Sequence, residues 1–228
     1  MRIASTAYGR RVALDLAPAD LAAVRAVLPW WWRDDDPALA ADVRLVVPSA
    51  EEARDVVAAL ELDVAEHAVD RVFVHAAVVA HGDRALLLPG SSFVGKSTLT
   101  AALLATGLDY LSDEYAVLDT TGSVHAYPRP LSTRTAAGPT RRTVDHVTGP
   151  LQVTAIALLQ YATGATYDVR SLPPGDAVLG VLANTVCASS RPAEALAAVA
   201  AAVDGATSVV GYRGEAREAA HRVRELLD

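Results

Sequence analysis

Residues 84–107 combine an apolar run, a glycine-bounded segment and a helical pattern in one continuous stretch. The run RALLLPG predicts a buried strand, and KSTLTAALLATG predicts a helix that ends at Gly107. Between them, the segment from Gly90 to Ser97 fits the pattern G-x-x-x-x-G-K-[ST] at every fixed position. This order predicts an α/β fold in which the segment joins the end of a strand to the start of a helix.

The spacing within this segment has a physical cause. Glycines let backbone N–H groups turn inward without a Cβ in the way, and the helix that begins at Lys96 directs its N-terminal dipole at the same place. In such a phosphate loop the lysine contacts the β- and γ-phosphates and the Ser97 hydroxyl binds Mg²⁺, so we expect ATP and Mg²⁺ as cofactors. The residues expected to contact the nucleotide are Gly90, Ser91, Ser92, Phe93, Val94, Gly95, Lys96, Ser97, Thr98 and Arg134.

The basic residues support this interpretation. The chain has nineteen arginines and a single lysine, Lys96. The two side chains differ as phosphate ligands, because the lysine ammonium group is a compact point charge on a slim stem. A lone lysine at the lysine position of the loop favours phosphate binding over a glycine-rich turn that binds nothing.

An adjacent acid pair, Asp113 and Glu114, follows seventeen residues after Lys96. Ordinary P-loop ATPases and GTPases carry their metal-orienting acid at the end of another long apolar strand. The apolar strand predicted over 151–162 ends without an acid, so this pair is the only candidate for that place. The alternative is a pair that is merely solvated, or caps a strand end.

A histidine, His75, lies in an apolar strand predicted over 72–80. A short turn connects this strand to the one that leads into the phosphate loop. A two-residue turn sets His75 opposite Leu88, and a turn one step later sets it opposite Gly90. In either register His75 lies beside the strand end that leads into the loop, although a core or surface histidine without a role is the alternative.

These elements resemble a known family. The stretch VHAAVVAHGDRALLLPGSSFVGKSTLTAALLATGLDYLSDEYAVL, and VHAYPRPLSTR after it, are similar to the catalytic domain of HPr serine kinase/phosphorylase and to the HprK-related kinases, relatives of ATP-dependent phosphoenolpyruvate carboxykinase. The resemblance covers residues 72–134 and continues only in element order over 150–228. It implies an α/β protein with a P-loop, HPr kinase/phosphoenolpyruvate carboxykinase-like mixed-sheet core at 70–228. Residues 1–69 are expected to form a small N-terminal α/β appendage.

The resemblance also implies an activity, that of an ATP-dependent kinase. Asp113 takes the position of the acid that accepts the proton of the attacking hydroxyl, and His75 that of the histidine paired with this acid. The implied catalytic residues are Asp113, His75 and Lys96, and the implied metal ligands are Ser97, Asp113 and Glu114.

Two departures from the family pattern bear on turnover. Glu114 replaces an aspartate, which adds a methylene to a metal or water contact. Phe93 and Val94 replace small residues of the loop, which narrows the γ-phosphate region. They keep open a second hypothesis, an ATP-binding accessory or switch protein that transfers no phosphate.

For the kinase, the resemblance implies an acceptor hydroxyl on a serine or threonine of a peptide or small protein. HprK-related proteins often accompany the biosynthesis of ribosomally made modified peptides, so a lasso-type precursor is a specific expectation. Four arginines lie in or near the long loop predicted over 135–149, where they would neutralise phosphoryl charge, clamp the acceptor or simply be solvated. They are Arg129, Arg134, Arg141 and Arg142.

Composition narrows the partners. The net charge of −7 and the pI of about 5.3 argue against non-specific nucleic-acid binding and against an anionic membrane surface. One cysteine, Cys187, and the lack of a signal-peptide pattern predict a cytoplasmic protein, with a homo-oligomer left open. The run Trp30–Trp32 is interpreted as packing of the appendage against the core, with a partner-binding patch as the alternative.

Overall fold

The computed structural model describes residues 1–90, 95–135 and 138–228. Its contacts divide the chain into two compact units, Met1–Arg71 and Val72–Asp228. The first carries a three-stranded sheet and the second an eight-stranded mixed sheet, so the expectation of a mixed α/β protein with a small N-terminal sheet is confirmed. Within the described residues, no helix combines the length and the apolar character that a membrane crossing requires.

In the N-terminal unit, β1 and β2 form an antiparallel pair and β3 adds to β2 in parallel. Trp31 and Trp32 are buried, with ring centroids 6.2 Å apart, whereas Trp30 is 42 % exposed. Two of the three tryptophans are therefore buried, and their packing against the core stays a prediction. The elements are β1 (Arg2–Ala7), β2 (Arg10–Leu16), a 3₁₀ turn (Pro18–Asp20), α1 (Leu21–Arg25), β3 (Val43–Val47) and α2 (Ala53–His67).

The main sheet has the strand order β12-β13-β11-β5-β4-β7-β8, and β6 also pairs with β4. Strands β5, β11 and β13 are parallel neighbours, so their carboxyl ends meet at one edge of the sheet. The strands are β4 (Val72–His81), β5 (Arg84–Pro89), β6 (Asp109–Ser112), β7 (Tyr115–Leu118), β8 (Val124–His125), β11 (Gln152–Tyr161), β12 (Asp168–Ser171) and β13 (Thr207–Arg213).

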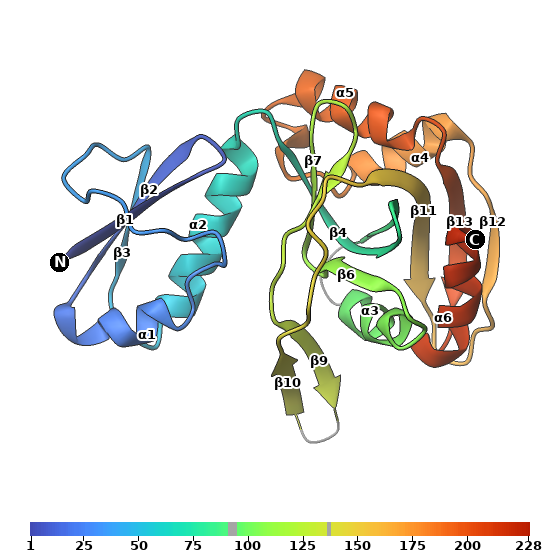
Figure 1. Ribbon diagram of the computed structural model, residues 1–228, viewed down its shortest axis with the longest axis horizontal. Helices are drawn as coiled ribbons and strands as arrows, with labels where there is room; N and C mark the ends of the chain where they lie inside the picture. The colour runs from blue at the N-terminus through green and yellow to red at the C-terminus, as the bar shows by residue number, and fades with distance from the viewer. Residues whose placement is uncertain (91–94, 136–137) are drawn as a thin grey trace. The chain divides into compact units, whose positions relative to one another are not determined.

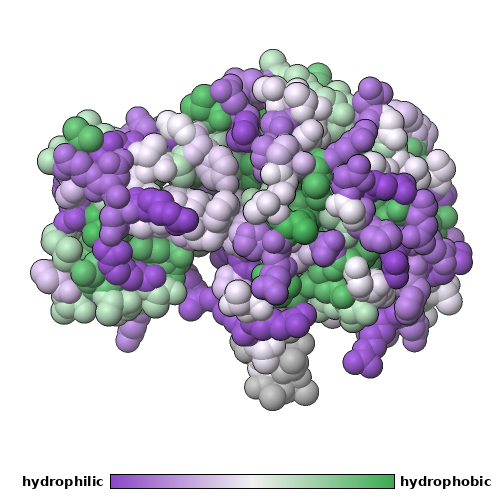
Figure 2. Space-filling view, viewed as in Figure 1, coloured by the Kyte–Doolittle hydropathy of each residue, from purple (hydrophilic) through white to green (hydrophobic). Residues whose placement is uncertain are grey.

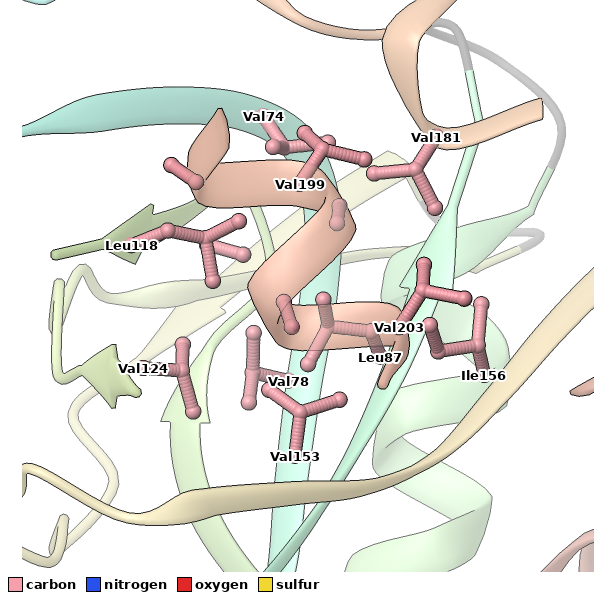
Figure 3. Packing of buried hydrophobic residues seen from close by; sticks show 14 of the residues in the cluster. Val74, Val78, Leu87, Leu118, Val124, Val153, Ile156, Val181, Val199 and Val203 are labelled. Carbon is pink, nitrogen blue, oxygen red and sulfur yellow. The ribbon is translucent and has the colours of Figure 1, made fainter. Parts of the chain in front are cut away.

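Helices cover both faces of this sheet (Figure 1). One apolar cluster joins the sheet to α4 (Pro174–Leu182) and α5 (Pro192–Val203), and Figure 3 shows Val199 of α5 beside Val74 and Val203 beside Ile156. The other joins it to α3 (Lys96–Leu104) and α6 (Ala216–Arg224). Burial on both faces explains why the central strands read as apolar runs rather than as alternating patterns.

The prediction of a long loop over 135–149 is wrong for the first part of that range. Strands β9 (Leu131–Thr135) and β10 (Gly138–Arg142) form an antiparallel hairpin, which projects from the unit while β9 lies against α3 (Figure 1). Glycine, proline and threonine made this segment look irregular. The backbone pairing of the hairpin supplies the regularity that the apolar pattern lacks.

Candidate functional site

The turn between β4 and β5 decides where His75 lies. His81 pairs with Arg84, so the turn is one residue later than the simplest choice, and Gly82 takes the positive φ of +64° that the first turn position requires. The Gly90 N–H accordingly donates to the His75 carbonyl at 3.0 Å. Of the two predicted registers, the pairing with Leu88 is wrong and the one opposite Gly90 is confirmed.

The acid pair interrupts the pairing of two short strands with β4. Ser112 of β6 pairs with Val78, and Tyr115 of β7 pairs with His75, so Asp113 and Glu114 lie in the gap between them. The Ser112 hydroxyl oxygen accepts hydrogen bonds from the N–H groups of Glu114 and Tyr115, each with an N–O distance of 3.1 Å. The serine oxygen thus takes the place of the backbone carbonyls that would accept these two N–H groups in an uninterrupted strand. The interruption is therefore stabilised by its own hydrogen bonds.

Asp113 is nearly buried and uses both carboxylate oxygens. Oδ2 accepts the Ser97 hydroxyl at 2.7 Å, and Oδ1 accepts the Tyr110 hydroxyl at 2.8 Å. The structure therefore brings together the predicted serine of the loop's helix and the predicted catalytic acid. Burial, followed by the charge of Asp113, raises the pKa of Tyr110 well above its usual range, so its phenol stays a donor.

Tyr110 is a site residue that the sequence analysis missed. It precedes Asp113 by three residues, and regular alternation along a strand would place the two side chains on opposite faces. They meet because the chain leaves the strand after Ser112. The Tyr110 hydroxyl also lies 3.0 Å from the Arg129 carbonyl, which ties the later loop to the same point.

Lys96 lies at the start of α3, where its Nζ donates to the Gly90 carbonyl at 2.6 Å. Burial lowers the pKa of its ammonium group, and the charges of Glu114 and Asp113 oppose that shift. The lysine, the acid pair and the start of the loop thus share one electrostatic neighbourhood. The ammonium remains part-buried, at the position from which a lysine reaches phosphates in this motif.

His75 and Glu114 flank this neighbourhood. The His75 ring lies on the Tyr115 ring, with centroids 4.9 Å apart, and burial lowers the pKa of His75 while the charge of Glu114 opposes this. Arg129 Nη1 lies 3.9 Å from Glu114 Oε2. Among the described residues, no hydrogen bond joins the His75 ring to Asp113, and their catalytic pairing stays a prediction.

The remaining residues predicted to contact the nucleotide or the acceptor lie either outside the described residues or on exposed surfaces. Ser91–Val94 lie outside the described residues, so the two loop departures stay untested, and the same holds for the side chain of Arg134. Thr98 is exposed in the first turn of α3, and Arg141 and Arg142 are exposed on β10. In Figure 2, hydrophilic residues cover the hairpin above its tip.

The site offers oxygen ligands for a metal: the Ser97 hydroxyl and the carboxylates of Asp113 and Glu114. One or two carboxylates suit Mg²⁺ when nucleotide phosphates and water complete its octahedron, so these residues fit the expected ion. Within the described parts of the chain, no three His, Cys, Asp or Glu side chains are grouped to hold a metal by themselves.

The sequence matches no protein-family model, and a search of curated proteins finds no match.

Proposed function

We propose that this protein is an ATP-dependent kinase that transfers the γ-phosphate to a hydroxyl group. The observation that carries the proposal is the 2.7 Å hydrogen bond from Ser97 to Asp113. It links the magnesium-binding position of the phosphate loop to the acid expected to activate the acceptor. The resemblance to the HprK-related kinases and their phosphoenolpyruvate carboxykinase-like P-loop fold supports the same conclusion.

The residues divide the chemistry between them. Asp113 accepts the proton of the acceptor hydroxyl, whose oxygen forms a bond to the γ-phosphorus while the bond from that phosphorus to the bridging β-phosphate oxygen breaks. ADP leaves with the electron pair, and Lys96 compensates negative charge on the phosphates. Magnesium bound with the nucleotide would add positive charge there, held by Ser97, Asp113 and Glu114.

Tyr110 orients the base. Its hydroxyl holds Oδ1 of Asp113 at 2.8 Å, which fixes the carboxylate plane and leaves Oδ2 on the side of Ser97. Because each carboxylate oxygen accepts two hydrogen bonds, Oδ2 can receive an acceptor hydroxyl beside the Ser97 contact. Asp113 is thereby positioned before the substrate arrives, which lowers the cost of reaching the reactive geometry.

The proposed acceptor is a serine or threonine hydroxyl on a peptide or small protein, with a lasso-type precursor as the specific candidate. The exposed hairpin bearing Arg141 and Arg142 lies against α3 through β9. A peptide held there by its carboxylates would remain next to the phosphate-loop helix. We place the protein in the cytoplasm, where ATP and newly made peptides are both available.

Ligand-induced stabilisation tests nucleotide binding. Mg-ATP at about 100 times its Kd should stabilise the wild type by about 2.7 kcal/mol and raise its Tm. Lys96→Ala should lose nearly all of that shift, because no other lysine exists to replace the charge. Exposed Arg170→Gln serves as the control and should keep the full shift. Equal shifts in wild type and Lys96→Ala would contradict the assignment of the phosphate loop.

Transfer of labelled γ-phosphate to co-encoded peptides then tests the reaction. Phosphorylated serine or threonine, identified by mass spectrometry, is the expected product. Mg-ATP binding without transfer to any such peptide or protein would favour the switch protein over the kinase.

A further inference from the structure

Arg213 ends β13 at the sheet edge that carries the phosphate loop. Its side chain is nearly enclosed, since the residue is only 3 % exposed. Nη2 donates to the Gly95 carbonyl at 3.0 Å, and Nη1 donates to the Gly214 carbonyl at 3.0 Å. The guanidinium carbon lies 5.3 Å from the centre of the Tyr161 ring, within cation–π range. The guanidinium is therefore held in one place.

Gly95, the residue that Arg213 contacts, is the N-cap of α3. Its carbonyl also accepts the Leu99 N–H at 3.0 Å, which is the first hydrogen bond of the helix. Its φ of +81° favours glycine, and a Cβ there would lie 2.7 Å from Arg213 Nη2. Glycine at this position thus meets two requirements, the backbone conformation and room for the guanidinium.

Arg213 and Lys96 line the same small pocket, whose apolar wall includes Leu88, Leu99 and Ala157. Burial lowers the pKa of Arg213, although Tyr161 and Glu215 oppose that shift. A phosphate near the first turn of α3 would favour the charged guanidinium further. Arg213 and Lys96 thus place two cationic side chains beside the first turn of α3.

We infer that Arg213 is a positioning residue for nucleotide binding, because its guanidinium anchors the Gly95 carbonyl and so fixes the first turn of α3. The N–H groups of that turn are the ones that a phosphate loop directs at its ligand. The inference rests on the proposed nucleotide binding and assigns a role in it to a residue more than a hundred positions from the loop in sequence.

The chain contains a matched control for this contact. Arg224 of α6 donates its Nη1 to the Thr106 carbonyl at 2.7 Å, just beyond the opposite end of α3. Both arginines connect the C-terminal segment to the same helix region by a hydrogen bond to a backbone carbonyl. Only Arg213 does so at the phosphate end, so Arg224→Gln reports what the loss of such a contact does to stability alone.

The test measures Kd for Mg-ATP by calorimetry, together with Tm, in wild type, Arg213→Gln, Arg213→Lys and Arg224→Gln. Arg213→Gln should weaken binding roughly ten- to one-hundredfold, the range for losing a hydrogen bond from a charged group. Arg213→Lys should recover part of the affinity, because it keeps the charge but not the two-pronged geometry. Arg224→Gln should lower Tm and leave Kd unchanged.

Each contrary result has a distinct meaning. Wild-type affinity in Arg213→Gln, or equal weakening in Arg224→Gln, overturns the role of Arg213 and leaves the kinase proposal in place. If Arg213→Gln does not fold, Arg213→Lys decides: at least threefold weaker binding at wild-type Tm supports the inference, and wild-type affinity overturns it. Failure of the wild type to bind Mg-ATP removes the proposed function and this inference with it.

Discussion

The acid cluster around Asp113 and the β9–β10 hairpin show two opposite ways of presenting charge. Asp113 is nearly buried, and hydrogen bonds from two different elements hold both of its oxygens. Arg141 and Arg142 are exposed on a two-stranded hairpin that projects from its unit. A charge that must react needs fixed geometry, whereas charges that attract a partner act over a longer range and tolerate motion.

This difference separates chemistry from recognition in the proposed kinase. Substitutions in the acid cluster should alter the rate of transfer, and substitutions on the hairpin should alter the acceptor concentration that transfer requires. Glu114 lies between the two cases, because its side chain is 40 % exposed although it adjoins Asp113.

The largest effect is expected at Asp113. Asp113→Asn keeps the shape but loses the proton acceptor, and transfer should fall about 10²–10⁴-fold in single-turnover assays. Mg-ATP affinity should change far less than the rate of transfer, because the phosphate loop and Lys96 supply most of the contacts to the phosphates. Glu114→Gln is the neighbouring control and should cost less. Similar transfer rates in wild type and Asp113→Asn would remove Asp113 from the mechanism.

A several-fold effect is expected on the hairpin. The double variant Arg141→Gln/Arg142→Gln should raise KM for an acidic peptide acceptor about two- to thirtyfold and leave kcat unchanged, because exposed charges contribute roughly 0.2–1 kcal/mol each. Arg170→Gln/Arg217→Gln removes the same charge from exposed positions elsewhere and should leave KM unchanged. A loss of kcat in the hairpin variant would mean that these arginines reach the transferring phosphate.

The smallest effect concerns His75, which is half-buried beside Tyr115. Burial lowers its pKa in the folded state, so the unfolded chain binds more protons as pH falls through the ordinary histidine value of about 6.5. The stabilisation from neutral His75 is therefore present above that pH and decreases below it, toward the lower folded-state pKa. Denaturant unfolding between pH 8 and 5.5 should show less loss of stability on acidification in His75→Asn than in wild type. An identical pH dependence would mean that His75 is not the group responsible.

The sequence alone was sufficient for features that depend on neighbouring residues. Strands over 72–80 and 84–90 and the helix from Lys96 appear where the apolar patterns predicted them. The phosphate-loop pattern is equally local, because its glycines act on their own backbone. The hairpin at 131–142 was missed because its pairing lacks an apolar signature.

The contacts that make these parts a site depend on the tertiary structure. A turn shifted by one residue places His75 opposite Gly90, and the interruption after Ser112 brings Tyr110 to Asp113. Arg213 reaches Gly95 across 118 positions of sequence. The periodicity of the sequence describes which way a side chain faces within its own element. These three contacts depend instead on strand register and on the parallel order of β5, β11 and β13. Only the packed sheet determines both.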